Sequence, residues 1–211
     1  MTSDILDEKL IERTPPAGPV TFEEFLAWCD EDTHAEWVDG EIIMMSPASD
    51  HHQDLNDFLI AVMRLFTEAH ELGWIRSAPF IMRTSVHPSG REPDILFVTK
   101  ARMQLIQPTF LDGPADLIVE IVSPESVGRD RGDKFVEYEA AGVREYWLID
   151  PLRQQVEFYQ LNDQGLYRAA ALDVDGIYHS NVMAGFRLRA AWLWQKPLPP
   201  VLSILKELGV L

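Results

Sequence analysis

Residues 116–122 read Asp-Leu-Ile-Val-Glu-Ile-Val (DLIVEIV), and this stretch decides the fold. Apart from its two charges it is apolar at every position, which is typical of a β-strand that is covered on both faces. In α/β proteins such strands lie in the middle of the sheet. We therefore predict a central strand here, with Glu120 inside it.

The segments that follow predict a parallel crossover. A helix is expected near residues 130–141, ended by Gly142, and a second buried strand follows at residues 145–149. Strand, helix and strand in this order usually connect parallel neighbours. Beyond them we expect antiparallel strands that extend the sheet, and then a short helix. These later segments are residues 155–161, 166–172, 186–188 and 201–208.

Upstream of the central strand, the sequence predicts a capped helix and a hairpin. Thr21 and Glu24 have the spacing of a capping box, in front of a short apolar segment. Asp39-Gly40 is the dipeptide best suited to a two-residue turn, and strand-like residues 34–38 and 41–45 flank it.

A long amphipathic helix is predicted from His52 to about Leu72, because its apolar residues recur at steps of three and four. Strands are then expected at residues 74–76, 80–86 and 94–98, with a turn at residues 87–90. Residues 99–114 are expected to form a connector with one helical turn.

Together these elements predict an α/β fold with a central mixed β-sheet, flanked by helices 52–72 and 130–141, and with additional antiparallel C-terminal strands. The 211 residues fit one domain. Residues 1–20 carry several prolines and mixed charge, so we expect an N-terminal arm followed by a single domain over residues 21–211.

The overall charge argues against a polyanionic partner. The chain has a formal net charge of −16 at pH 7, which repels phosphate backbones. Bound metal ions can neutralise an acidic site, and a local basic patch can coexist with a negative total. No apolar run approaches the roughly 20 residues that a membrane-spanning helix needs. With a single cysteine as well, we expect a cytoplasmic protein without a membrane partner.

Glu120 and Asp94 are the most informative acidic residues. An ionised carboxylate inside a doubly covered strand is costly unless a cation or hydrogen-bond donors compensate it. Asp94 begins a second apolar strand. Two carboxylates from neighbouring strands form a seat for Mg²⁺, which prefers one or two carboxylates plus water and phosphate oxygens. The alternative is that Asp94 only ends a turn and that Glu120 only pairs with a buried Arg or Lys.

Lys134 lies on the helix after the Glu120 strand, on one stripe with Asp130 and Tyr138 at four-residue spacing. Its amine could orient a water molecule that attacks a phosphate group, or it could hold that phosphate group. The alternative is an ordinary surface pair between Asp130 and Lys134.

Three further residues are weaker candidates. Glu36 and Glu41 fall on the same face of the predicted hairpin, and either could join the acidic residues, although solvated glutamates are the commoner case. For His52, helix capping or surface exposure is the commoner role. Zinc is not expected, because an HExxH arrangement is missing around His51 and His52.

An ordered series of motifs resembles the Uma-type restriction endonuclease family within the PD-(D/E)xK nuclease superfamily. The matching segments are residues 21–25, 36–41, 45–47 with His52, 92–95, 115–124, Asp130 with Lys134, and 141–151. This resemblance implies a restriction-endonuclease-like core, with Asp94 as the first metal ligand and Glu120 as the second. It also makes His52 a candidate phosphate contact. The third signature position departs from the pattern, because it holds Val122. In this family the lysine is found on the following helix, so Lys134 becomes the candidate.

The resemblance implies a metal-dependent endonuclease that hydrolyses DNA phosphodiester bonds with Mg²⁺ or Mn²⁺, and a homodimer that could cut two strands. Two other functions stay open. One is a binding module for DNA or protein, with the same fold and without the chemistry, which Val122 and the acidic composition favour. The other is an unrelated metal-dependent hydrolase acting on a small molecule.

Overall fold

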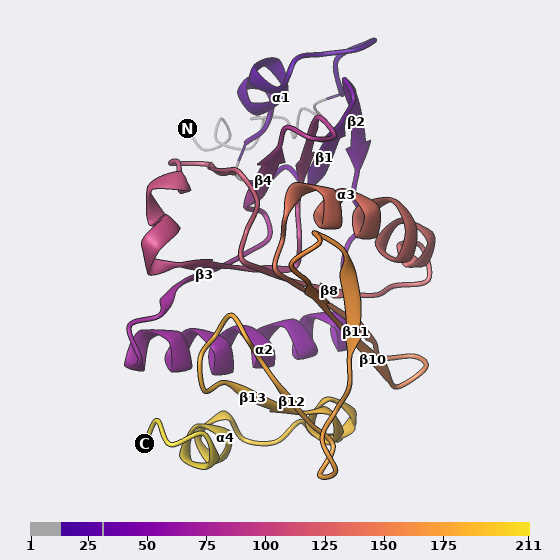
Figure 1. The fold of residues 1–211 in the computed structure, drawn as a ribbon. Helices are drawn as coiled ribbons and strands as arrows, with labels where there is room; N and C mark the ends of the chain where they lie inside the picture. The colour runs from indigo at the N-terminus through magenta and orange to yellow at the C-terminus, as the bar shows by residue number, and fades with distance from the viewer. Residues whose placement is uncertain (1–13, 31) are drawn as a thin grey trace, which may run out of the picture.

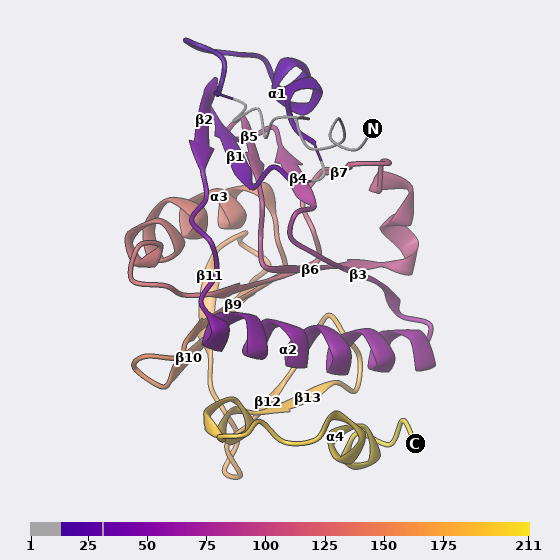
Figure 2. The same ribbon diagram turned by 180° about the vertical axis from the view of Figure 1, so that it is seen from behind.

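The computed structural model describes residues 14–30 and 32–211. Within these residues the strands form sheets of six, five and two strands. Helix α2 (Asp50–Ala69) runs along one face of the six-stranded sheet, and helix α3 (Lys134–Ala141) lies on its other side (Figures 1 and 2). The predicted α/β class, with a mixed sheet between helices, is confirmed.

The six-stranded sheet contains the predicted central strand. Its order is β11-β10-β9-β8-β6-β3, and β8 runs parallel to β9 whereas the other neighbours are antiparallel. Every residue of β8 is buried, as predicted. The strands, in chain order, are β3 (Gly73–Ser77), β6 (Ile95–Thr99), β8 (Leu117–Ile121), β9 (Glu145–Asp150), β10 (Gln155–Leu161) and β11 (Tyr167–Ala170).

Strand β8 divides its side chains between two cores. Val119 and Ile121 pack in the core that contains α2, whereas Ile118 and Val122 pack in the core on the opposite face. Because side chains alternate along a strand, Glu120 points to the same face as Ile118 and Val122, away from α2. The charged residue therefore lies between the central sheet and the elements stacked above it in Figure 1.

The five-stranded sheet lies above the six-stranded sheet in Figure 1, and its strand order is β2-β1-β5-β4-β7. Its hairpin forms as predicted, with Val38 opposite Glu41 and Glu36 opposite Ile43. Helix α1 (Phe22–Trp28) packs beside it and begins with the predicted capping box. The strands are β1 (Ala35–Val38), β2 (Glu41–Met44), β4 (Ile81–Thr84), β5 (Ser89–Arg91) and β7 (Phe110–Asp112).

Two short strands of this sheet correct the sequence prediction. Residues 87–90 were expected to be a turn, but the turn lies at residues 85–88 and β5 follows it. The expected connector, residues 99–114, contains the 3-10 helix η1 (Lys100–Leu105), and also β7. Three-residue strands have too few positions to show an alternating pattern, so only their pairing partners define them.

The C-terminal third also differs from the prediction in one respect. Strands β10 and β11 extend the main sheet as expected, but the strand predicted at residues 186–188 forms β13 (Arg187–Arg189), which pairs only with β12 (Ile177–His179). This hairpin crosses the α2 side of the sheet, because Tyr178 stacks on Phe158. The chain then passes through η3 (Ala190–Trp194) to α4 (Val201–Glu207).

The helix boundaries shift slightly from those expected. Ser49 caps α2, which therefore starts at Asp50 and ends at Ala69. The helix predicted from residue 130 begins as a π-helical turn, η2 (Arg129–Asp133), before α3. None of the helices in the described ranges has both the length and the apolar character needed to span a bilayer. Most of the predicted arm, residues 1–13, lies outside the described residues.

Candidate active site

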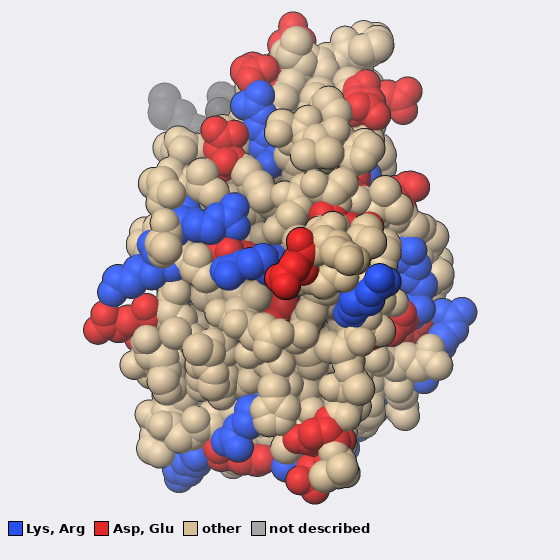
Figure 3. All heavy atoms as spheres, viewed as in Figure 1, with Lys and Arg blue, Asp and Glu red and all other residues tan. Residues whose placement is uncertain are grey.

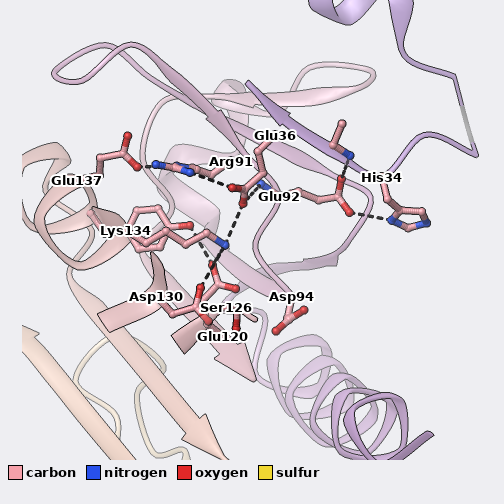
Figure 4. A network of polar contacts seen from close by, with 12 residues as sticks. His34, Glu36, Arg91, Glu92, Asp94, Glu120, Ser126, Asp130, Lys134 and Glu137 are labelled. Atoms are coloured by element: carbon pink, nitrogen blue, oxygen red, sulfur yellow. Dashed lines mark hydrogen bonds and ion pairs between the residues drawn. The ribbon is translucent and has the colours of Figure 1, made fainter. Parts of the chain in front are cut away.

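Asp94 lies next to the strand that contains Glu120. Strands β6 and β8 are antiparallel, and Ile95 at the start of β6 lies opposite Val119, so Asp94, in the bend just before β6, lies level with Glu120. The backbone N–H of Ile121 donates to Asp94 Oδ2 at 2.6 Å, which ties the carboxylate to the end of β8. Figure 4 shows the Asp94 carboxylate beside the network that contains Glu120, and a metal ion shared by the two acids stays a prediction.

Glu120 is held by two donors at one oxygen. Lys134 Nζ lies 2.8 Å from Oε1, and the Tyr138 hydroxyl donates to the same atom at 3.0 Å. The Glu120 side chain is only 5% exposed. Burial raises the pKa of this carboxyl, and the carboxylates of Asp130 and Asp94 raise it further against the opposing charge of Lys134. The lysine alone therefore does not fully compensate Glu120.

Asp94 is more accessible, with 19% of its side chain exposed. His52 Nε2 lies 3.2 Å from Asp94 Oδ2, the oxygen that also accepts from Ile121. Burial opposes the charged imidazole, but the hydrogen bond and the charge of Asp94 raise the pKa of His52 above its usual value. His52 therefore contacts the site itself, and neither capping nor surface exposure accounts for its side chain.

One oxygen of each acid remains available. Among residues 14–30 and 32–211, no hydrogen bond reaches Glu120 Oε2 or Asp94 Oδ1, because the donors described above all use the other oxygen. Asp130 Oδ1 is also buried without a hydrogen-bond partner. Carboxylate oxygens in such a position can accept a cation without breaking the bonds that orient them.

Lys134 is buried at the start of α3, with 2% of its side chain exposed. Besides Glu120, its Nζ lies 2.9 Å from Glu36 Oε1 and 3.7 Å from Asp130 Oδ1. The alternative of an exposed surface pair with Asp130 is therefore wrong. Val122, at the signature position, packs in the core on the α3 face and cannot take the place of a lysine.

The two hairpin glutamates have different fates. Glu36 is fully buried and joins the site, so a solvated role is wrong for it. Glu41 lies at the start of β2 and is exposed, in agreement with the solvated alternative. The two share a face of the hairpin, and Glu36 lies where Lys134 reaches it (Figure 4).

Arg91 and Glu137 complete the network and were not identified from the sequence. Arg91 donates from Nη1 to Glu36 Oε2 at 2.9 Å and from Nε to Glu137 Oε2 at 2.6 Å. Charges therefore alternate along Glu120, Lys134, Glu36, Arg91 and Glu137 (Figure 4). Arg91 stands in β5, which looked like a turn in the sequence, so nothing local indicated its burial.

The donor set fits a hard divalent cation. Carboxylates outnumber cationic side chains around Glu120, and Glu120 and Asp94 each have one oxygen without a hydrogen bond among the described residues. Nowhere in the described part of the chain do three or more His, Cys, Asp or Glu side chains form a group that could hold a metal ion. A two-carboxylate seat suits Mg²⁺ or Mn²⁺, which retain waters and bind phosphate oxygens, rather than structural zinc.

A solved structure of similar fold places the protein in the nuclease-like fold class. It is described as a putative nuclease belonging to DUF820 from Anabaena variabilis ATCC 29413, and the match has a TM-score of 0.70 at 19% sequence identity. The match covers 83% of this chain and 98% of that one. At this identity the similarity shows the shared fold.

The sequence comparison defines the family. The Uma2 family, described as "Putative restriction endonuclease", matches residues 22–191, and the chain belongs to this family. The matched range includes Glu36, Asp94, Glu120 and Lys134. A search of curated proteins found no match.

Proposed function

We propose that the protein is a metal-dependent endonuclease that hydrolyses phosphodiester bonds in DNA. Asp94 and Glu120 are the proposed ligands of Mg²⁺ or Mn²⁺, and Lys134 is the proposed catalytic lysine. The observation that carries this proposal is that Asp94, just before β6, is bound to the end of β8 next to Glu120, with one free oxygen on each acid, beside a buried lysine.

Asp94 Oδ1 and Glu120 Oε2 would hold the cation, because their other oxygens are already bound. When bound, a divalent cation supplies Lewis-acid stabilisation of negative charge on the reacting phosphoryl group. His52 and the Ile121 amide fix Asp94 through Oδ2, and Tyr138 fixes Glu120 through Oε1. These bonds keep the free oxygens directed out of the network.

Lys134 is suited to donate hydrogen bonds and not to act as a base that accepts a proton. Burial opposes its charge, but the carboxylates of Glu120 and Glu36 raise the pKa of Lys134 well above its usual value, so the amine stays protonated at neutral pH. It donates one N–H group to Glu120 and forms an ion pair with Glu36, which leaves a third N–H group. The third can donate to a phosphate oxygen or to the attacking water, as an electrostatic stabiliser of the transition state.

Because the protein is strongly acidic overall, DNA must be attracted by basic side chains close to the site. On the face viewed in Figure 3, basic and acidic side chains alternate instead of forming one broad basic surface. Arg129, in the turn before Lys134, has no ion pair with any residue of the described ranges, while its neighbour Arg131 pairs with Asp150 and Glu157. We therefore assign a phosphate contact to Arg129.

The test is cleavage of supercoiled plasmid with Mg²⁺ or Mn²⁺ added. Wild-type protein should nick or linearise the plasmid, and Asp94→Ala and Glu120→Ala should each abolish cleavage. Glu41→Gln is the matched control, because it removes an exposed carboxylate outside the site. Cleavage that survives both alanine substitutions contradicts the proposal.

A second candidate is a nuclease-fold module that binds DNA or protein without cutting. The observation that favours it is the burial of Lys134 and Glu120, which leaves little room for a scissile phosphate. Saturable DNA binding with no cleavage under any divalent cation would support this module.

The domain organisation, the cellular location and the oligomeric state are part of the proposal. We propose that residues 21–211 act as one domain, that the protein is cytoplasmic, and that it forms a homodimer. The edge strand β2 offers unpaired backbone groups for pairing with a second copy, and its Met44 is 52% exposed. Light scattering after size-exclusion chromatography measures the mass that distinguishes monomer from dimer.

A further inference from the structure

Lys134 is shared between carboxylates from two different sheets. Its Nζ lies 2.9 Å from Glu36 Oε1 in β1 and 2.8 Å from Glu120 Oε1 in β8. The near-equal distances mean that the ammonium charge is divided between them. Figure 4 shows the amine between the two carboxylates, so the five-stranded sheet contributes directly to the candidate site on the six-stranded sheet.

Glu36 is built to remain charged. Its side chain has no solvent exposure, and both of its oxygens are bound. Arg91 Nη1 donates to Oε2 at 2.9 Å, and the backbone N–H of Glu92 donates to Oε1 at 3.3 Å. Burial opposes ionisation, but the charges of Lys134 and Arg91 lower the pKa of Glu36 to about 2.

The charge of Arg91 does not cancel that of Glu36. Arg91 is bound more closely by Glu137, whose Oε2 accepts from Nε at 2.6 Å, than by Glu36. Arg91 and Glu137 therefore balance each other, and Glu36 is left to balance Lys134. Without Glu36, the lysine would have Glu120 as its one carboxylate within hydrogen-bonding distance among the described residues, and it would cancel the charge that a divalent cation needs there.

We propose that Glu36 is the counter-ion of Lys134 and that it keeps the charge of Glu120 available for a divalent cation. The proposal rests on the proposed function in one respect, that Glu120 is a metal ligand. Glu36 touches neither the substrate nor the cation, so it is a positioning residue. Its effect is transmitted through the shared ammonium group.

The test is calorimetric titration of the full chain with Mn²⁺ in the absence of nucleic acid. Glu36→Gln keeps the side-chain shape and an acceptor oxygen but removes the charge. We expect it to weaken Mn²⁺ binding by about 10- to 100-fold, the usual effect of losing a partner behind a metal ligand. Glu92→Gln is the matched control. It removes the same charge from a neighbouring buried residue whose carboxylate contacts His34 and the Ala35 amide instead of Lys134.

Equal losses in Glu36→Gln and Glu92→Gln would overturn the proposal, because they would reflect only the general loss of negative charge. A second substitution separates positioning from folding. In the double variant Glu36→Gln/Lys134→Gln, the unbalanced positive charge of Lys134 is also removed. Its Mn²⁺ affinity should therefore return to within a few-fold of wild type. A purely structural role of Glu36 would not be relieved in this way.

Lys134→Gln alone keeps the proposal testable if Glu36→Gln does not fold. It should bind Mn²⁺ at least as tightly as wild type, and weaker binding would overturn the proposal. Variants of the two acids distinguish an error in the metal ligands from an error in the counter-ion role of Glu36. If Asp94→Ala and Glu120→Ala bind Mn²⁺ like wild type, the proposed ligands are wrong, and the counter-ion role falls with them. If they lose binding while Glu36→Gln keeps it, only the counter-ion role is wrong.

Discussion

The Lys134 ammonium group lies 2.8 Å from Oε1 of Glu120, although the two residues belong to different elements and are 14 positions apart. The PD-(D/E)xK superfamily signature that the sequence resembles places the lysine two positions after this glutamate, where the chain has Val122. Val122 points to the same face as Glu120, but it packs in the core. Helix α3 delivers the amine to the carboxylate from above the strand, so the chemical pair is preserved while the sequence spacing is not.

We expect Lys134→Gln to lower the single-turnover rate of DNA cleavage by about 10²- to 10³-fold at saturating Mg²⁺, the usual cost of losing one donor to a developing negative charge. Quenched-flow cleavage of a labelled duplex measures this rate. Mn²⁺ affinity, measured alongside, should not fall. A rate within a few-fold of wild type would remove Lys134 from the proposed catalytic group.

Mg²⁺ should raise the thermal stability of the wild-type protein and not that of Asp94→Asn. A ligand at about 100 times its Kd stabilises the folded state by about 2.7 kcal/mol, which scanning calorimetry detects as a rise in Tm. The amide oxygen introduced by Asp94→Asn can still accept from the Ile121 amide, so the fold is expected to survive the change. Glu41→Gln serves as the control and should show the wild-type shift. An equal shift in Asp94→Asn would argue against this ligand.

The protein without divalent cations should lose stability as the pH rises. Burial raises the pKa values of Glu120, Asp130 and Glu145, and the partner Asp94 raises that of His52. Groups with raised pKa values bind more protons in the folded state, so their contribution is present at low pH and disappears as the pH passes the folded-state pKa.

Urea unfolding in chelator at about pH 5, 6.5 and 8 measures this dependence. The free energy of unfolding should fall across the series, and Mg²⁺ should reduce the fall because it replaces the lost protons at Glu120. Glu120→Gln should show a shallower dependence. A stability that rises steadily with pH in chelator would contradict the assigned directions.

Arg129→Gln should weaken DNA binding more than Arg131→Gln does. Both arginines lie in η2, but Arg131 is engaged by Asp150 and Glu157, whereas Arg129 has no ion pair in the described part of the chain. Loss of one phosphate contact should reduce the slope of log affinity against log salt by about 1. Fluorescence anisotropy in Ca²⁺ over a salt series measures that slope. Equal slopes for Arg129→Gln and wild type would exclude the contact.

Much of the fold could be predicted because its signals are local. The capping box at Thr21, the Asp39-Gly40 turn and the periodic apolar face of α2 depend on a few neighbouring residues, and each forms as expected. The apolar segment around Glu120 predicted a doubly covered strand correctly. In contrast, β5 and β7 have three residues each, and their strand character comes from their pairing with β1 and β4.

The candidate site divides in the same way. Asp94 and Glu120 could be identified as candidate ligands from the sequence, because a charge in or beside an apolar strand is conspicuous without any knowledge of its surroundings. The burial of Glu36, the exposure of Glu41 and the ion pair between Arg91 and Glu36 became apparent only from the tertiary structure. The burial of a hairpin residue depends on which sheet packs against it, and that packing is set by contacts between segments far apart in the chain.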